Sequence, residues 1–444
     1  MKAGARLQTA IELLDEITAQ AGKPADAVIS DGFRQRRFAG SKDRAAISEI
    51  VYGVLRCRGQ IDWWLSRSDL PVDGRGRALT YAALMAPVAE GGTDILTDFA
   101  EQAEYGVTPP DAAETAWLDG IRGHGLGHPD QPVWVAANLP EWAAARFNEQ
   151  FGTDWTRQAA ALAAEAPVDV RINPTKADRE AVAVSLAQEG IETAPCALSP
   201  VGLRLARRRP LRGTRAFKDG WLEVQDEGSQ LVALLTHAQP GMKVVDFCAG
   251  AGGKTLALAA GMDNKGRIVA CDTSETRLNR AAERLKRAGS FIVERRVLSS
   301  ARDKWVKRRS GRFDGGFDRV LVDAPCTGSG TWRRNPDQKW RLGESDLAEL
   351  TGLQSEILSS AARLVAPDGR LIYATCSLLK AENEERIEAF LAERPDFFRY
   401  PIEDVWAETV GGTCPMTGGA LQLTPADHDT DGFYCAVLGR KLTA

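Results

Sequence analysis

The chain lacks the features by which membrane proteins and disulfide-rich proteins are recognised. No run of about 18 apolar residues occurs, which argues against a transmembrane helix. Acidic side chains interrupt the apolar positions near the N-terminus, which argues against a signal peptide. The eight cysteines are dispersed and form no pair separated by two residues, a distribution typical of reduced thiols. These absences predict a cytoplasmic protein.

The chain also lacks an excess of positive charge. Its 56 Lys and Arg residues stand against 60 Asp and Glu residues, for a formal net charge of −4. This balance excludes a protein that is basic over its whole surface, although a local basic patch can still bind nucleic acid. A composition of 44% hydrophobic and 26% charged residues is typical of a globular protein. The length of 444 residues predicts about three domains.

Two kinds of pattern occupy the first half of the chain. Residues 1–130 are predicted to be helical, because apolar residues recur at helical spacing after a candidate N-cap at Ser41. The clearest apolar face consists of Ile47, Ile50, Val51 and Val54. Residues 131–220 mix a strand, predicted over 168–172, with a helix predicted over 177–190. We expect an all-helical domain followed by a small α+β subdomain.

Residues 221–444 alternate short apolar strands with helices. The strands are predicted at 243–247, 267–272, 319–323 and 370–374, and helices at 274–288 and 347–364. Repeated strand–helix units predict a doubly wound parallel sheet, so the fold class is α/β with a Rossmann-like domain. Ligands of such sheets bind where the strands end, and Asp246, Asp272 and Asp323 are expected to gather there.

A glycine-rich segment follows the first of these strands and opens a helix. Residues 246–255 read Asp-Phe-Cys-Ala-Gly-Ala-Gly-Gly-Lys-Thr. A Walker A loop would need glycine in place of Cys248, and a dinucleotide fingerprint would need glycine in place of Thr255, so neither pattern fits. Methyltransferases that use S-adenosylmethionine combine such a turn with an acid at the end of the second strand, the place of Asp272. S-adenosylmethionine is therefore the expected cofactor.

Two cysteines follow predicted strands at the same end of the sheet. Cys326 ends the sequence Asp-Ala-Pro-Cys, and Cys376 is the centre of Thr-Cys-Ser. A thiolate that adds to carbon 6 of cytosine makes carbon 5 able to attack a methyl sulfonium, and an acid at the ring nitrogen N3, here Asp323, favours the addition. Lys254 is a candidate for lowering the pKa of the attacking cysteine. Residue chemistry alone leaves open which cysteine attacks. Other cysteines are predicted to be buried packing residues: Cys57, Cys196, Cys271, Cys414 and Cys435.

Two segments concentrate positive charge in this otherwise acidic chain. Residues 204–218 contain seven basic residues and no acid, namely Arg204, Arg207, Arg208, Arg209, Arg212, Arg215 and Lys218. Residues 294–319 contain nine basic residues and four acids, with Trp305, Phe313 and Phe317 among them. We predict that the first segment faces a polyanion such as RNA. For the second, RNA bases stacked on the aromatic rings and a solvated helix face are equal alternatives.

These motifs together resemble those of the RNA cytosine-C5 methyltransferases. The resemblance rests on the loop at 246–255, Asp-Ala-Pro-Cys at 323–326, Thr-Cys-Ser at 375–377 and Asp-Gly-Phe-Tyr at 431–434. Phe-Ala-Gly-Ser-Lys-Asp-Arg at 38–44 and Val-Tyr-Gly-Val-Leu-Arg at 51–56 resemble the helical extension of the RsmB/Sun-type bacterial ribosomal RNA methyltransferases. That extension is similar to the antitermination factor NusB. The resemblance spans most of the chain.

The resemblance implies roles for domains and residues. Residues 1–130 would form a NusB-like RNA-binding domain, 131–220 a small RNA-binding subdomain and 221–444 the catalytic domain. The implied catalytic residues are Cys376, which forms the adduct with carbon 6, Cys326, which aids release, and Asp323. The implied S-adenosylmethionine contacts are Cys248, Ala249, Gly250, Ala251, Gly252, Gly253, Lys254, Asp272 and Asp323. The implied substrate is small-subunit (16S) ribosomal RNA, methylated by a monomer.

The chain departs from the family in two places, and other functions remain open. Ala251 stands where the family usually has proline, and residues 297–302 carry no acid where the family usually contacts the adenine side of the cofactor. The alternatives are a transfer RNA or DNA cytosine-C5 methyltransferase and a non-catalytic RNA-binding ribosome assembly factor. No metal site is predicted, because the glycines around His124 and His128 argue against a helix that would pair them.

Overall fold

The computed structural model describes residues 1–85, 106–310 and 315–442. The chain forms two compact units: unit 1 comprises Met1–Glu165 and Trp332–Glu344, and unit 2 comprises Ala166–Thr331 and Ser345–Ala444. The division into three domains with boundaries at 130 and 220 stays a prediction. Within the described ranges, every helix is too short or too polar to cross a bilayer.

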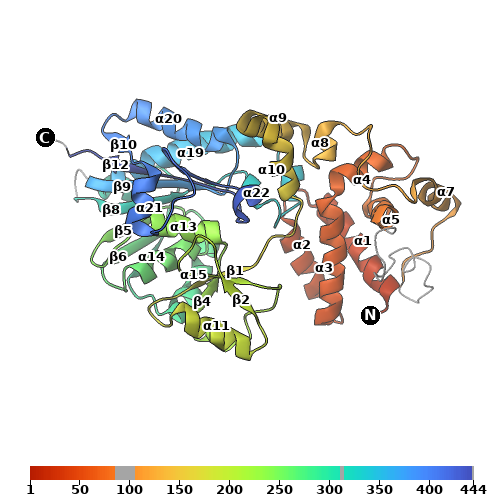
Figure 1. Cartoon of the computed structure of the whole chain (residues 1–444), viewed down its shortest axis with the longest axis horizontal. Coiled ribbons are helices and arrows are strands. Elements are labelled where there is room, and N and C mark those ends of the chain that lie inside the picture. Colours follow the sequence, from red (N-terminus) through yellow and green to blue (C-terminus); the bar gives the residue numbers. More distant parts are fainter. Residues whose placement is uncertain (86–105, 311–314, 443–444) are drawn as a thin grey trace. The chain divides into compact units, whose positions relative to one another are not determined.

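Unit 1 is helical, as the sequence predicts (Figure 1). Its described helices are α1 (Ala3–Ala19), α2 (Ala25–Gln35), α3 (Ser41–Arg56), α4 (Arg58–Leu65), α5 (Gly74–Met85), α7 (Ala112–Ile121), α8 (Val133–Ala136), α9 (Glu141–Phe151), η2 (Gly152–Asp154), α10 (Trp155–Ala161) and α18 (Gln338–Arg341). The apolar face of α3 is confirmed, since Ile47 and Val51 are fully buried in a core shared with α1. The N-cap is Gly40, so the prediction of Ser41 is wrong by one residue. Asp43 explains why α3 begins after Gly40, because the Asp43 carboxylate accepts the Gly40 N–H at 3.3 Å.

The segment 332–344 belongs to unit 1 although it follows a strand of unit 2 in the chain. Trp332 is fully buried and stacks on Phe147 of α9, with ring centroids 6.0 Å apart. Asp337 accepts the Ala25 N–H at 3.1 Å and thereby satisfies one of the free donors at the start of α2. Unit 1 is therefore built from two stretches of chain that are distant in sequence.

Unit 2 contains a four-stranded antiparallel sheet with the order β2-β3-β1-β4. Its elements are β1 (Asp169–Ile172), α11 (Arg179–Gln188), β2 (Thr193–Pro195), β3 (Gly202–Leu205), α12 (Arg215–Lys218) and β4 (Leu222–Val224). Val182 and Leu186 of α11 pack with Val170 and Leu203 of the sheet in one apolar core. The small α+β region is thus confirmed, with its predicted strand and helix in place.

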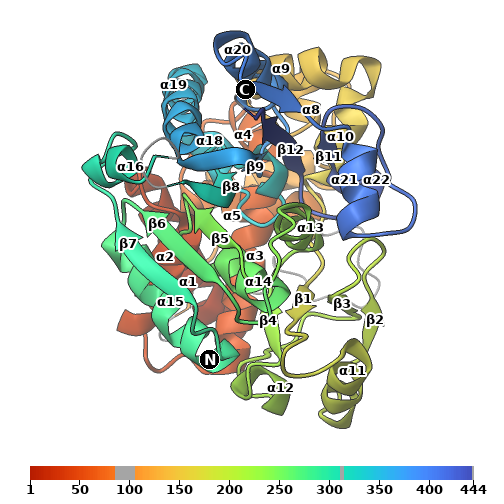
Figure 2. The same cartoon turned by 90° about the vertical axis from the view of Figure 1, so that its left-hand side faces the viewer.

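A larger sheet with eight described strands forms the core of unit 2 (Figure 2). The strands are β5 (Lys243–Asp246), β6 (Arg267–Asp272), β7 (Val293–Val297), β8 (Phe317–Asp323), β9 (Val365–Thr375), β10 (Phe397–Arg399), β11 (Leu421–Leu423) and β12 (Phe433–Arg440). Their order is β10-β12-β9-β8-β5-β6-β7, with β11 paired to β12. Strands β5 to β9 pair in parallel, and β10 to β12 pair antiparallel. The four strands expected from the sequence all occur in the parallel part.

Helices cover both faces of this sheet, which confirms the doubly wound Rossmann-like fold. They are α13 (Glu227–Leu235), α14 (Gly253–Gly261), α15 (Glu275–Ala288), α16 (Lys304–Arg308), η3 (Ser329–Thr331), α19 (Glu344–Ala361), η4 (Ala362–Leu364), η5 (Lys380–Glu382), α20 (Glu384–Glu393), α21 (Ile402–Thr409) and α22 (Pro425–His428). Val244 packs with α13, α14 and α21, while its neighbour Val245 packs with α16, α19 and α20, because successive strand residues point to opposite faces. The parallel strands β5, β6, β8 and β9 end along one edge, which we call the carboxyl edge.

Candidate active site

The glycine-rich loop joins β5 to α14 at the carboxyl edge, and two of its glycines have conformations that side chains disfavour. Gly250 has φ +54°, and a Cβ built there meets no atom within 4 Å, so open space lies beside the loop. Gly252 has φ +80°, and a Cβ there would come within 2.9 Å of the Ala281 Cβ of α15. The loop therefore packs tightly on its helix side and leaves room on the other.

Two acids at the ends of β5 and β6 flank this loop. Asp272 is 6% exposed and accepts one backbone N–H on each oxygen, from Gly250 at 2.9 Å and from Ser274 at 2.7 Å, so each oxygen has acceptor capacity left. Asp246 is fully buried; its Oδ2 accepts the Thr255 hydroxyl at 2.6 Å, whereas its Oδ1 has no partner. Burial raises the pKa of Asp246 to about 7.

These residues fit the cofactor that the sequence predicts. The open space beside Gly250 can admit a ligand close to the backbone, and the spare lone pairs of Asp272 suit ribose hydroxyl groups. The unpartnered oxygen of Asp246 is an acceptor that suits a donor such as an amino group. The predicted contacts from Cys248 to Lys254, together with Asp272, all lie in this loop or beside it.

An ion pair joins the first turn of α14 to the end of β8. Lys254 is 8% exposed, and its Nζ donates to Asp323 Oδ2 at 2.7 Å. Burial opposes the charged form, but the charge of Asp323 and this hydrogen bond outweigh it and raise the pKa of Lys254; a Cys376 thiolate acts in the same direction. Lys254 is therefore an ammonium group held against the carboxylate of Asp323.

The two cysteines of the predicted active site are in contact. Cys326 follows β8 and Cys376 follows the neighbouring strand β9, and their Sγ atoms lie 3.4 Å apart. Both are half-buried. The hydrogen bond with Cys376, followed by burial, raises the pKa of Cys326, so the Cys326 thiol keeps its proton at neutral pH.

The other cysteines differ in burial. Cys196, Cys271 and Cys435 are buried, as the packing prediction requires, and the remaining ones are half-buried: Cys57, Cys248 and Cys414. Burial raises the pKa of Cys248 and raises the pKa of Cys435 to about 12, so both are thiols at neutral pH.

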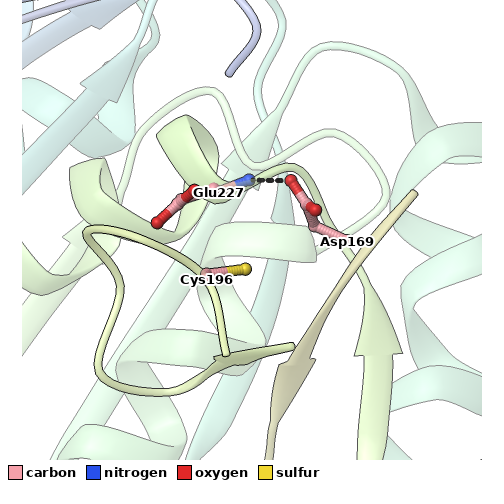
Figure 3. A group of neighbouring side chains, drawn as sticks. All are labelled: Asp169, Cys196 and Glu227. Carbon is pink, nitrogen blue, oxygen red and sulfur yellow. Dashed lines mark hydrogen bonds between the residues drawn. The ribbon is translucent and has the colours of Figure 1, made fainter. Parts of the chain in front are cut away.

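One group of potential metal ligands occurs in the described part of the chain, and the sequence did not point to it (Figure 3). Asp169, Cys196 and Glu227 are buried, with ligand atoms within 4.8 Å of one another. Arg204 already supplies the positive charge that a metal ion would bring to these carboxylates. Its guanidinium donates to Asp169 at 2.7 Å and lies 3.5 Å from Glu227. We call these four residues the Arg204 cluster. Arg204 also donates to the exposed Asp429 at 2.6 Å, so acids of the protein occupy its guanidinium and Arg204 is wrongly predicted as part of an RNA-facing patch.

The exposure of individual side chains changes the interpretation of the two basic segments. Six basic residues of the first segment other than Arg204 are exposed, and their contact with RNA stays a prediction: Arg207, Arg208, Arg209, Arg212, Arg215 and Lys218. In the second segment Trp305 and Phe317 are buried in the core of unit 2, with ring centroids 6.1 Å apart. RNA stacking on these two rings is therefore wrong, because their apolar faces fill the sheet–helix interface. Phe313 lies outside the described residues.

The chain matches models of known protein families. A family model described as "16S rRNA methyltransferase RsmB/F" matches residues 233–439, and one described as an RsmF/B-like ferredoxin-like domain matches residues 139–212. Ribosomal RNA small subunit methyltransferase B of Salmonella typhi is 31% identical over 425 residues, covering 90% of this chain and 91% of that protein. The probable ribosomal RNA small subunit methyltransferase B of Synechocystis sp. is 36% identical over 305 residues, covering 68% and 66%.

Solved structures agree with these relatives. The crystal structure of PH0851 superposes with a TM-score of 0.76 at 28% identity and covers 99% of both chains. A methyltransferase homologue from Pyrococcus horikoshii superposes with a TM-score of 0.58 at 27% identity, covering 69% of this chain and 97% of that one. The fold and the loop at the carboxyl edge thus define a Rossmann-like methyltransferase. The chain belongs to the RsmB/F methyltransferase family.

Proposed function

We propose that this methyltransferase transfers a methyl group from S-adenosylmethionine to carbon 5 of a cytosine in 16S ribosomal RNA, through a covalent adduct of Cys376. The observation that carries the proposal is the 3.4 Å contact of Cys326 and Cys376 at the carboxyl edge, next to the Lys254–Asp323 pair. The names of the relatives, ribosomal RNA small subunit methyltransferase B, support the choice of substrate.

S-adenosylmethionine supplies an electrophilic methyl group when it is bound. The glycine-rich loop from Cys248 to Lys254 lets the cofactor approach the backbone, and Asp272 accepts hydrogen bonds from its ribose. Asp246 offers its unpartnered oxygen to the amino group. These residues bind and orient the donor beside the two cysteines.

Residues of the protein make the cytosine nucleophilic, so that it can attack the electrophilic methyl group. Cys376 adds as a thiolate to carbon 6 of a base held out of its stack, since the attack needs the face of the ring. The proton shared between Lys254 and Asp323 is available to the ring nitrogen N3, which takes up the electron pair displaced by the addition. Carbon 5 then has enamine character and attacks the methyl group.

Release requires loss of the carbon-5 proton to a base and cleavage of the bond between carbon 6 and Cys376. The electron pair of the C–H bond forms the double bond between carbons 5 and 6 again, Cys376 leaves as a thiolate, and N3 returns its proton to the Lys254–Asp323 pair. Cys326 is kept protonated and lies in hydrogen-bond contact with this sulfur, so it stabilises the leaving thiolate. The contact between the Cys326 and Cys376 sulfur atoms is thereby restored.

The first test is the Cys326→Ala variant with 16S ribosomal RNA and S-adenosylmethionine. We expect an RNA–protein adduct that survives denaturant, because the variant forms the bond to carbon 6 but lacks the donor that assists its cleavage. The Cys326→Ala/Cys376→Ala double variant is the control and is expected to give no adduct. An adduct that persists in the double variant would refute Cys376 as the nucleophile.

A second test identifies the substrate and position. Bisulfite sequencing of cellular RNA with and without the protein is expected to reveal one methylated cytosine in 16S ribosomal RNA that depends on it. Methylation of transfer RNA alone would reject the proposed substrate. Failure of calorimetry to detect S-adenosylmethionine binding would instead favour a non-catalytic assembly factor.

A further inference from the structure

Glu382 has a fully buried carboxylate that no sequence motif singled out. It ends η5, directly before Asn383 and α20. No ion pair to Glu382 occurs among the residues that the structure describes. A buried carboxylate without a cation is unfavourable unless hydrogen bonds satisfy its oxygens. The partners of Glu382 therefore explain why the chain places a charge here.

Both oxygens of Glu382 are satisfied, and the loops that carry the two cysteines provide most of the donors. Oε1 accepts the Thr327 N–H at 2.8 Å and the Gln354 Nε2 at 3.0 Å. Oε2 accepts the hydroxyl groups of Thr327 and Ser377. Thr327 directly follows Cys326, and Ser377 directly follows Cys376. One carboxylate thus holds the residue next to each cysteine.

The strands alone do not hold the two cysteines together. The paired residues of β8 and β9 end at Asp323 and Ala374, and both cysteines lie beyond this last pair. Further hydrogen bonds link the two cysteine loops around Glu382. Gln354 also donates to the Pro325 carbonyl at 2.9 Å, and the Gly330 N–H donates to the Cys376 carbonyl at 3.0 Å. Glu382 is the centre of this frame because its two oxygens bind both loops.

From this geometry we infer that Glu382 is the positioning residue that sets the contact between Cys326 and Cys376. It acts through Thr327 and Ser377 rather than by touching RNA or the cofactor. Its consequence for turnover rests on the proposed function, in which Cys326 assists the departure of Cys376. A shift of the two sulfur atoms by about 1 Å is enough to cost a reaction of this kind about 100-fold.

The kinetic test compares Glu382→Ala with Glu382→Gln and with the matched control Glu384→Ala. Glu384 accepts hydrogen bonds from Arg399 and Tyr434, and within the described ranges it forms no hydrogen bond with either cysteine loop. We expect Glu382→Ala to lower kcat about 100-fold per folded enzyme, with KM for RNA unchanged, and to accumulate the denaturant-stable adduct. Glu382→Gln is expected to regain most of the loss, because its amide oxygen still accepts the Thr327 N–H and its amino group can donate to the hydroxyls.

A purely structural role for Glu382 predicts a different result. The yield of folded enzyme and the amount of RNA–protein adduct would then decrease in proportion, and kcat per folded molecule would stay at the wild-type value. That outcome, or a loss of the same size in Glu384→Ala, would overturn the inference.

An RNA-free measurement keeps the inference testable if Glu382→Ala does not fold or if the proposed reaction is wrong. Thr327→Val removes one hydroxyl donor, and diamide then reports on sulfur proximity by taking two electrons and two protons from Cys326 and Cys376 as they form a disulfide. Mass spectrometry is expected to show slower disulfide formation in Thr327→Val than in the wild type and Glu382→Gln. Equal rates would refute the positioning role, whatever the Cys326→Ala adduct assay shows about the reaction.

Discussion

Two regions of unit 2 each place a cysteine beside buried acidic groups, but only one is suited to chemistry. At the carboxyl edge, Cys376 is half-buried and contacts Cys326, and the same edge holds the ion pair of Lys254 and Asp323. In the Arg204 cluster, Cys196 is buried and the guanidinium of Arg204 is hydrogen-bonded to carboxylates. Both regions combine sulfur, carboxylate and a cation.

The difference shows that access and hydrogen-bond partners decide the reactivity of a thiol. Burial and the neighbouring Asp169 and Glu227 charges raise the pKa of Cys196, so this sulfur remains an inert thiol. Cys376 has a second thiol as its partner and is only half-buried. A list of residue types would not separate the two regions, whereas their surroundings do.

The largest expected effect compares the two cysteines directly. Cys376→Ala is expected to lower the methylation rate by about 1,000-fold or more, because the covalent route is lost. Cys196→Ala is expected to keep the wild-type rate, because its sulfur is buried in the Arg204 cluster and is not one of the two contacting cysteines. Transfer of labelled methyl groups to 16S ribosomal RNA measures both. Comparable losses in the two variants would remove the distinction between the regions.

The next effect concerns stability in the Arg204 cluster. Arg204→Met is expected to lower the free energy of unfolding by about 3–5 kcal/mol, because it leaves the fully buried Asp169 and Glu227 without their cation. The matched control Arg212→Met replaces an exposed arginine of the same segment. It is expected to change the free energy of unfolding by less than about 0.5 kcal/mol. Urea denaturation of both variants is the measurement, and equal stabilities would contradict the role given to Arg204.

The smallest effect is a pH dependence at the carboxyl edge. Asp246 has no cation hydrogen-bonded to it, and burial raises its pKa from 3.8 to about 7. The folded protein therefore holds this proton longer than the unfolded chain, so stability present below about pH 4 is lost as the pH rises towards 7. Relative to Asp246→Asn, the free energy of unfolding of the wild type is expected to fall by up to about 1.4 kcal/mol per pH unit in this window. Parallel urea titrations between pH 5 and pH 8 measure it; a constant difference would show that Asp246 is ionised throughout.

Local patterns predicted most of the fold and the elements of the site. The strands β5, β6, β8 and β9 were recognisable because buried parallel strands are short apolar runs, and each is followed by its acid or cysteine. The glycine-rich loop was recognisable in the same way, because it directly follows β5 and opens α14. Such features depend on neighbours in sequence, so the sequence reports them directly.

Other features depend on partners far away in the chain. Arg204 reads as one of seven surface cations until β1 and α13 bring two buried carboxylates to it. Trp305 reads as an exposed stacking platform until α16 packs it against Phe317. Glu382 reads as one acid in a polar run until the two cysteine loops meet around it.

The sequence by itself determined the chemistry available to this protein: a glycine-rich cofactor loop with Lys254, the acid Asp323 and two cysteines that follow strands. Only the tertiary structure decided which charged and sulfur-bearing groups are used in packing and which remain at the carboxyl edge. The physical reason is that burial and hydrogen bonding set the protonation and access of these groups, and both arise from contacts between segments distant in sequence. The 3.4 Å contact between Cys326 and Cys376 is such a product of the fold.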